Sequence, residues 1–280
     1  MPELPEVETV VRDLRPMLCG QRIDRIQTGR ARLRRPWQKR WEKLLVGRRF
    51  NAVRRRGKWI ILDLDESGHI LVHLGMTGQL TIASARSPRL NHTHVLMTLE
   101  GGDAQLRYRD VRRFGSVEFW PISQAIDDLL AEKLGPEPWE LPSDWHQAIS
   151  KSARCLKAIL LDQRVVAGVG NIYADESLFE AGLSPEQLGV HTRPADAARL
   201  REAIICVLER AIAARGATIR DYVGGSGLQG GYQNEFQVYG RTGQPCPRCT
   251  RPIESLRLAG RSTHYCPACQ PVRVRASGRK

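Results

Sequence analysis

The sequence predicts an α+β protein with an N-terminal β-sandwich domain, a helical middle region and a C-terminal zinc finger. Three observations lead to this prediction. Short apolar runs separated by turn residues fill positions 22–120, apolar residues recur at helical spacing after position 122, and four cysteines in two pairs stand near the C-terminal end. The chain has 280 residues, 41% of them hydrophobic, so it can bury a core and is expected to form two or three domains.

The first expected element is an amphipathic helix that starts near Pro5 and ends at Pro16. Proline suits the first turn of a helix but stops a helix that has already formed. Between the two prolines, four apolar residues follow the spacing i, i+3, i+4 and i+7: Val7, Val10, Val11 and Leu14.

Strands are expected from Arg22 to about Trp120, where the apolar runs are short. The runs cover residues 50–53, 59–64, 70–74, 95–99, 106–108 and 117–120. Many short strands with turn residues between them are typical of a β-sandwich.

Four helices are expected from Ile122 onward, and a proline-rich break at residues 135–142 marks the approximate domain linker. The clearest helical patterns cover residues 155–161, 171–182 and 194–215. Asn171 is expected to be the N-cap of its helix. The segment 224–231 has five glycines in eight residues and is expected to form a mobile loop.

The charge of the chain favours a polyanionic partner. Lys and Arg number 43 against 30 Asp and Glu, which leaves a formal net charge of +13. The excess gathers in residues 22–58 and in residues 241–280, whereas the rest of the chain has more acidic than basic residues. Two basic regions of this kind are a suitable footprint for a protein that clamps a nucleic-acid duplex.

The chain is expected to be a cytosolic protein that does not enter a membrane. Its first twenty residues contain Glu3, Glu6 and Glu8 but no apolar run of signal-peptide length, and no stretch reaches membrane-spanning length. Three isolated cysteines suit a reducing compartment better than a disulfide framework: Cys19, Cys155 and Cys206.

Four cysteines predict a structural zinc site. Cys246 and Cys249 form one C-x2-C pair, Cys266 and Cys269 form another, and sixteen residues separate the pairs. Four cysteine ligands leave no open position on zinc for a catalytic water, so the metal would stiffen the hairpin between the pairs.

The N-terminus is a candidate nucleophile. Proline at position two is small enough for the initiator methionine to be removed, which would leave the secondary amine of Pro2 at the start of a helix. A free α-amine titrates near pH 8, roughly two units below a lysine side chain, so a useful fraction is unprotonated at neutral pH. Such an amine can attack a sugar carbon.

The opening string MPELPEVET at residues 1–9 resembles the start of formamidopyrimidine-DNA glycosylases. Four further strings resemble the same family in the same order: RGK at residues 56–58, HLGMTG at 73–78, DVRRFG at 110–115 and GVGNIYA at 168–174. The cysteine pairs complete the series, so the resemblance covers the chain from Pro2 to Cys269.

The resemblance implies a division into four parts. Residues 1–135 would form the catalytic helix and the β-sandwich, residues 136–223 a helix-two-turn-helix domain that binds DNA, and residues 237–280 the zinc finger. Residues 224–236 would form a glycine-rich loop that covers a base extruded from the duplex. Arg220 stands where lysine would be expected.

The resemblance also implies catalytic roles. Pro2 would attack the anomeric carbon of the damaged nucleotide, and the resulting Schiff base would lead to β,δ-elimination. Glu3 would protonate the sugar ring oxygen, and Glu6 would position the N-terminus. Lys58 would hold the phosphate beside the lesion and assist elimination, and Arg261 would clamp phosphates.

The remaining implied residues contact DNA. Met76, Arg112 and Phe114 would fill the gap left by the extruded base and face the orphaned cytosine, because Phe can wedge between bases and Arg can donate to a base edge. Asn171 would contact a phosphate at a helix N-terminus. His92 and Arg154 would be further backbone contacts.

These features together predict an enzyme that excises oxidised purines from double-stranded DNA and cleaves the abasic strand. It is expected to be a monomer with one structural zinc and with no redox or nucleotide cofactor. Two alternatives remain. One is the sister class called endonuclease eight, which acts on oxidised pyrimidines; Leu4 and the set Met76, Arg112 and Phe114 argue against it. The other is a non-catalytic zinc-ribbon DNA-binding protein, which has no need of a trimmed proline followed by acids.

Overall fold

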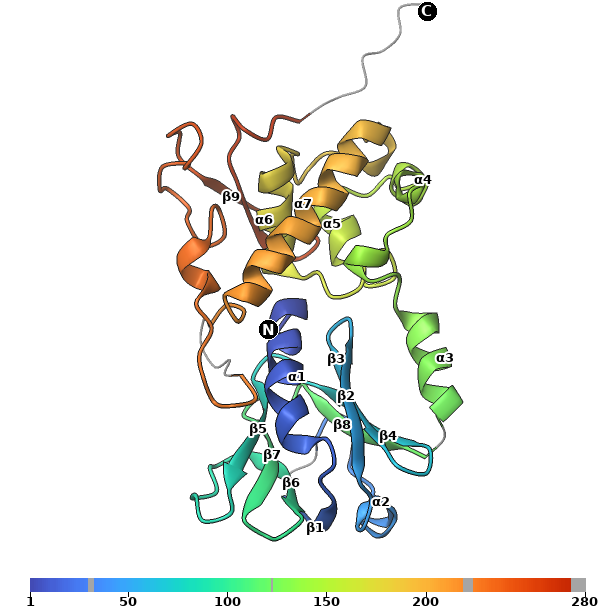
Figure 1. Ribbon diagram of the computed structural model, residues 1–280. Helices are drawn as coiled ribbons and strands as arrows, with labels where there is room; N and C mark the ends of the chain where they lie inside the picture. The colour runs from blue at the N-terminus through green and yellow to red at the C-terminus, as the bar shows by residue number, and fades with distance from the viewer. Residues whose placement is uncertain (30–32, 122, 219–223, 273–280) are drawn as a thin grey trace, which may run out of the picture. The chain divides into compact units, whose positions relative to one another are not determined.

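The computed structural model of the protein describes residues 1–29, 33–121, 123–218 and 224–272 (Figure 1). The chain divides into two compact units. The first consists of Met1–Glu132 and Ile212–Gln233, and the second consists of Lys133–Ala211 and Asn234–Lys280.

The first unit is built on two antiparallel sheets of four strands, in the orders β1-β6-β7-β5 and β2-β3-β4-β8. The strands are β1 (Ile23–Thr28), β2 (Phe50–Arg56), β3 (Trp59–Leu64), β4 (Gly68–His73), β5 (Gly78–Ser84), β6 (Thr93–Leu99), β7 (Ala104–Asp110) and β8 (Ser116–Trp120). The predicted β-sandwich is confirmed. The strands β1 and β5 were not expected from the sequence.

The helix α1 (Leu4–Leu18) shares one hydrophobic core with both sheets and contacts β2, β3 and β5 (Figure 1). The prediction that Pro16 ends this helix is wrong, since α1 continues for two residues beyond it. Pro16 lies in the last turn, where the proline disturbs little of the helix, and Leu18 behind it is fully buried in the core. Burial of that side chain favours the helical residues beyond the proline.

Two further helices belong to this part of the chain. The short helix α2 (Lys39–Leu45) interrupts the region that was expected to hold only strands. The helix α3 (Ser123–Lys133) follows β8, where helical spacing begins in the sequence.

The second unit contains α4 (Trp145–Ser150), α5 (Leu156–Leu161), α6 (Asn171–Ala181) and most of α7 (Pro194–Ala213). Its C-terminal part is a hairpin of β9 (Glu254–Leu258) and β10 (Arg261–Tyr265), and β10 contacts α6. Gly182 ends α6 in the left-handed conformation, at the end of the range that the sequence predicts. The expected N-cap is wrong, because Gly170 occupies that position and Asn171 is the first helical residue.

No helix among the described residues is both long enough and apolar enough to cross a membrane.

Candidate functional site

The start of α1 brings the three N-terminal candidates together. Pro2, Glu3 and Glu6 are all buried, and the two carboxylic acids are only 2% and 1% exposed. Glu3 and Glu6 form a capping box, in which the backbone NH of Glu3 donates to Glu6 Oε2 at 2.8 Å. The other oxygen, Oε1, accepts the backbone NH of Ala217 at 2.7 Å. The backbone around Pro2 is therefore held by a buried carboxylate with two backbone partners.

Lys58 lies at the same end of the first unit as the start of α1. The contacts between α1 and β2 give this direction: Arg15 Nε donates to the carbonyl of Val53, whereas Glu8 accepts from Arg55 Nε at 2.9 Å. α1 and β2 therefore run in opposite directions. The start of α1 accordingly lies near the end of β2 and the turn that carries Lys58. The Lys58 side chain is 7% exposed.

His73 is a neighbour of this turn that the sequence analysis left without a role. It pairs with Trp59 across β3 and β4, and the two rings lie 4.7 Å apart. Burial, followed by the charge of Lys58, lowers the pKa of His73 to about 4. The imidazole is therefore neutral at physiological pH and accepts the backbone NH of Gly75 at Nδ1.

The three expected base-stack residues come together on two adjacent loops. Met76 and Phe114 are 37% and 45% exposed, so neither belongs to the core. The guanidinium of Arg112 lies 4.7 Å from the centre of the Phe114 ring, which is a cation–π contact. Exposed apolar side chains beside an arginine suit insertion into a base stack.

A buried network holds these two loops together. Thr77 Oγ1 donates to Asp110 Oδ1 at 2.5 Å and accepts the backbone NH of Arg112 at 3.0 Å. The other oxygen of Asp110 accepts the backbone NH of Gly115 at 2.9 Å. Gly75 packs so closely on this loop that a Cβ there would lie 2.5 Å from Gly115 N. Thr77 and Asp110 lie within the quoted sequence motifs, but their spacing did not reveal this role.

The two further residues that were expected to contact the DNA backbone, His92 and Arg154, lie on loops. His92 is exposed and has a φ of 66°, and its carbonyl accepts the backbone NH of Asp110. Arg154 is exposed in the second unit and forms an ion pair with Asp162 at 3.0 Å. Arg220 lies outside the described residues.

The four paired cysteines form a cluster that fits a zinc ion. Their sulfur atoms all lie within 4.8 Å of one another, with 3.9 Å between Cys246 and Cys269 and 3.4 Å between Cys249 and Cys266. Four sulfurs bound tetrahedrally at a Zn–S distance of about 2.3 Å would lie about 3.8 Å apart. Burial raises the pKa of the Cys269 thiol to about 12, so a cation is needed for all four thiols to ionise together.

Asn171 and the hairpin of β9 and β10 meet in the second unit. Asn171 Nδ2 donates to the carbonyl of Ser262 at 2.9 Å, and Ser262 directly follows Arg261 in β10. The side chain of Arg261 is exposed. Because the Asn171 amide binds the hairpin, it fixes the position of Arg261 relative to the N-terminus of α6.

A buried ion pair supports this junction and was missed by the sequence analysis. Lys157 Nζ, fully buried, donates to Asp175 Oδ1 at 2.5 Å and to the carbonyl of Asn171 at 2.8 Å. The other oxygen of Asp175 accepts the backbone NH and the ring Nδ1 of His264 in β10. Three elements, α5, α6 and β10, are thereby joined by one carboxylate. A lone lysine within a helical pattern carries no signal of this role.

Comparison with known proteins decides the family. Three family descriptions match successive parts of the chain: the formamidopyrimidine-DNA glycosylase N-terminal domain at residues 1–117, the formamidopyrimidine-DNA glycosylase H2TH domain at 134–223, and the zinc finger found in FPG and IleRS at 243–272. The chain belongs to the formamidopyrimidine-DNA glycosylase family.

Individual members of this glycosylase family match along nearly their whole length. The chain is 46% identical over 265 residues to formamidopyrimidine-DNA glycosylase of Moorella thermoacetica, covering 92% of this chain and 95% of the relative. It is 41% identical over 274 residues to that of Carboxydothermus hydrogenoformans, covering 96% and 100%.

Solved structures of the glycosylase family also match. The wild-type Lactococcus lactis Fpg in complex with N7-benzyl-Fapy-dG containing DNA has a TM-score of 0.89 and 37% identity, over 96% of this chain and 100% of that chain. A complex of the same protein with DNA containing an abasic site has the same TM-score and identity, over 96% and 99%. The expected family and its fold are confirmed.

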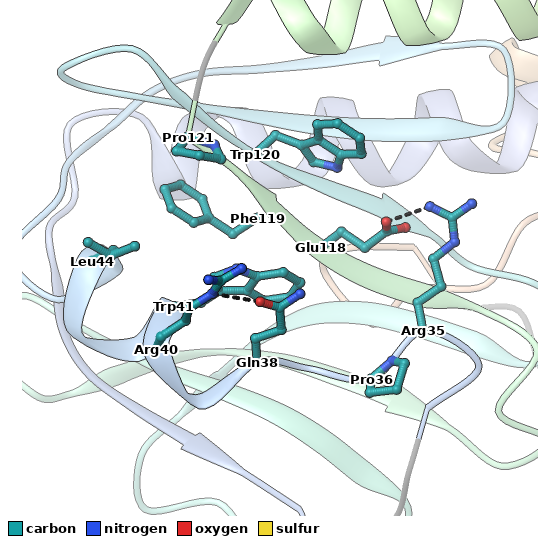
Figure 2. Close-up of a pocket in the computed structure, with 10 residues that line it drawn as sticks. All are labelled: Arg35, Pro36, Gln38, Arg40, Trp41, Leu44, Glu118, Phe119, Trp120 and Pro121. Carbon is teal, nitrogen blue, oxygen red and sulfur yellow. Dashed lines mark hydrogen bonds and ion pairs between the residues drawn. The ribbon is translucent and has the colours of Figure 1, made fainter.

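A separate pocket of about 550 Å³ lies in the first unit between α2 and β8 (Figure 2). Its lining includes Trp41 and Trp120 together with an ion pair of 2.5 Å between Arg35 and Glu118. None of the residues that the glycosylase resemblance singles out lines this pocket, so it is not part of the candidate site.

Proposed function

We propose that this protein is a base excision repair enzyme that removes oxidised purines, such as 8-oxoguanine and formamidopyrimidines, from double-stranded DNA and then cleaves the abasic strand. Membership of the glycosylase family supports the first step. The observation that carries the proposal is the start of α1, where Pro2 adjoins the two buried carboxylic acids Glu3 and Glu6.

The proposed chemistry uses the amine of Pro2 after removal of Met1. The amine attacks the anomeric carbon, the damaged base departs with the bonding electrons, and Glu3 protonates the ring oxygen as the sugar opens. The product is a Schiff base between Pro2 and the sugar. β-Elimination then breaks the 3′ carbon–oxygen bond and δ-elimination breaks the 5′ bond, so phosphates flank the gap. Lys58 and Arg261 hold these phosphates and assist the eliminations.

The other residues of the site would hold the flipped-out state of the DNA. Met76, Arg112 and Phe114 would fill the gap in the stack and face the orphaned cytosine, and residues 224–236 would cover the extruded base. Phosphate contacts would come from His92, Arg154 and Asn171. When bound by the four cysteines, zinc supplies rigidity to the hairpin that carries Arg261. We expect a cytosolic monomer with no other cofactor.

The test is covalent trapping. The protein, with its N-terminus defined by mass measurement, is incubated with borohydride and a duplex that carries 8-oxoguanine opposite cytosine. A covalent protein–DNA band is expected, because borohydride reduces a Schiff base to a stable amine. A variant that retains Met1 should give no band while it still binds the duplex, since its amine is displaced by one residue.

Three outcomes would contradict the proposal or a part of it. Absence of a band with the trimmed protein would favour a non-catalytic DNA-binding protein. Faster trapping with an oxidised pyrimidine than with 8-oxoguanine would favour the endonuclease eight class. Equal trapping by the Met1-retaining variant would move the nucleophile to another amine, with Lys58 the first to examine.

A further inference from the structure

The glycine-rich segment 224–231 is bound to α1 through one carboxylate. Asp13 Oδ2 accepts three hydrogen bonds, from the backbone NH of Ser226 at 3.2 Å, from its hydroxyl at 2.8 Å and from Arg215 Nη2 at 2.7 Å. The same arginine nitrogen reaches the Ser226 hydroxyl at 3.3 Å. Arg215 precedes this segment in the chain and Ser226 lies within it, so Asp13 joins both to the helix.

Two glycines of the segment allow this close approach. A Cβ at Gly224 would lie 2.5 Å from Asp13 Oδ2, and a Cβ at Gly225 would lie 2.8 Å from Leu14 Cγ and 2.9 Å from the carbonyl of Val10. At Gly231, in contrast, the nearest atom would be 3.7 Å away, which is ordinary contact. The glycine content alone predicts mobility, but at positions 224 and 225 its structural reason is the absence of a side chain against α1.

Backbone hydrogen bonds hold the segment at further points. The strand β5 lies at the edge of its sheet, and the NH of Ile82 in this strand donates to the carbonyl of Gly225 at 3.2 Å. The NH of Gly230 donates to Thr218 Oγ1 at 2.8 Å, and the NH of Gly231 donates to the carbonyl of Ala214 at 2.9 Å. The described part of the loop is therefore docked along α1 and β5.

The helix presents its two loop-binding acids on one face. Glu6 and Asp13 are seven residues apart, which places them two turns apart on the same side of α1. Glu6 holds Ala217, whereas Asp13 holds Arg215 and Ser226. Burial alone would raise the pKa of Asp13, but the hydrogen bonds from Arg215 and Ser226 outweigh it and keep the pKa below its usual value. Asp13 is thus an anion at neutral pH.

We propose that Asp13 is a positioning residue that anchors the glycine-rich loop to the helix bearing the nucleophile. This inference rests on the proposed function, in which Pro2 attacks a nucleotide whose extruded base is covered by residues 224–236. Because one rigid helix carries both Pro2 and the anchor of the loop, the loop keeps a defined distance from the nucleophile. The position of the loop should affect the rate of excision, when the damaged base is attached. It should have little effect on the rate of cleavage at an abasic site, where the base has left.

The experiment compares wild type with Asp13→Asn, which keeps the size of the side chain but removes its charge. Single-turnover rates are measured on two duplexes, one with 8-oxoguanine and one with a preformed abasic site. Glu42→Gln is the matched control, because Glu42 also pairs with a cation and a hydroxyl, Lys39 and Thr28, but on α2. We expect Asp13→Asn to lower excision of 8-oxoguanine about tenfold, the scale of one lost charge-assisted hydrogen bond, and to leave abasic cleavage unchanged. Glu42→Gln should leave both rates unchanged.

Hydrogen exchange of residues 224–231 tests the anchor without reference to activity. Asp13→Asn should speed exchange of the Ser226 amide about tenfold. Gly225→Ala should do the same by steric conflict with α1, whereas Gly231→Ala should not change the exchange at Ser226.

Three results would separate the possible failures. Unchanged excision and unchanged exchange in Asp13→Asn would overturn the anchor. Equal losses on both duplexes would overturn it too, because they would indicate a general effect on the fold or on the nucleophile. Wild-type inactivity on both duplexes would refute the proposed function instead, and the exchange comparison would then decide whether Asp13 anchors the loop.

Discussion

The carboxylate of Glu6 accepts the backbone NH of Ala217 at 2.7 Å, across 211 positions of sequence. The same carboxylate accepts the backbone NH of Glu3 at 2.8 Å. One buried acid thus ties the residue next to Pro2 to the chain after α7. A Cβ at Gly216 would lie 2.8 Å from Glu6 Oε1, so the glycine allows this approach.

Replacement of Glu6 by glutamine should destabilise the fold and slow trapping. Glutamine keeps one acceptor oxygen but turns an NH2 group toward a backbone NH, which leaves a buried donor unsatisfied. We expect a loss of about 1 to 3 kcal/mol in the free energy of unfolding, measured by urea denaturation. Glu8→Gln is the control, because Glu8 is more exposed than Glu6 and one of its partners, Arg12, lies at the surface, so it should cost less than Glu6→Gln. Equal costs for the two variants would remove the special role of Glu6.

Glu3→Gln should separate base removal from strand cleavage. The substitution keeps shape and hydrogen bonding but removes the proton that opens the sugar ring. Excision of 8-oxoguanine should fall by about 10² to 10⁴, the usual contribution of general acid catalysis. A preformed abasic site should still be cut, because its sugar exists partly as the open aldehyde. Single-turnover cleavage of the two duplexes measures both steps, and comparable losses on both would show that Glu3 instead positions or deprotonates Pro2.

Thr77→Val should loosen the loops that carry Met76, Arg112 and Phe114. Valine fills the same space but leaves Asp110 Oδ1 and the backbone NH of Arg112 without the hydroxyl that joins them. The free energy of unfolding should fall by about 1 to 3 kcal/mol.

Thr77→Val should also lose part of its preference for cytosine opposite the lesion. Arg112→Ala should lower the same preference, because it removes the side chain proposed to face the orphaned cytosine. The readout is the ratio of excision rates for duplexes with cytosine and with adenine opposite 8-oxoguanine. If Arg112→Ala itself left this ratio unchanged, the assignment of Arg112 to the orphaned base would be wrong.

Cys249→Ser should release zinc and weaken DNA binding at every sequence alike. Loss of one ligand opens the cluster, the hairpin loses its rigidity, and Arg261 no longer holds a phosphate, a contact that carries no base information. We expect about a tenfold loss of affinity at fixed salt, together with a smaller dependence of affinity on salt. Cys206→Ser is the control, since Cys206 is exposed and lies outside the cluster. Unchanged affinity in the zinc-free protein would disprove the role of the hairpin.

His73 should make the fold sensitive to mild acid. Its pKa is about 4 in the folded protein against 6.5 for the free side chain, so the unfolded chain binds the proton first as pH falls. The stabilising contribution is complete above pH 6.5 and is lost between pH 6.5 and 4, by about 3 kcal/mol in total. His73→Gln should therefore lose less stability than wild type between pH 7 and 4.5 in urea denaturation. Parallel losses in the two proteins would contradict the assignment.

The sequence alone predicts the family, the two-layer sandwich and the four cysteines that form the cluster. The family follows from the resemblance of whole sequence strings. The sandwich, α1 and the cysteine cluster follow from local patterns: short apolar runs between turn residues, an i, i+3, i+4 pattern in α1, and two residues between paired cysteines. Local spacing also misleads in definite ways. The local pattern predicts that Pro16 ends α1, but the helix continues to Leu18. The burial of Leu18 depends on residues from both sheets, which the local pattern does not contain.

Tertiary structure alone decided which groups hold the candidate residues in place. Thr77 meets Asp110 across 33 positions, Asp175 meets His264 across 89, and Asp13 meets Ser226 across 213. A hydrogen bond depends on the distance and direction between two atoms, and these are set by how distant segments pack. The glycines at 224 and 225 show the same limit: composition cannot distinguish a loop that moves freely from one that must lie against a helix, because both require a residue without a side chain.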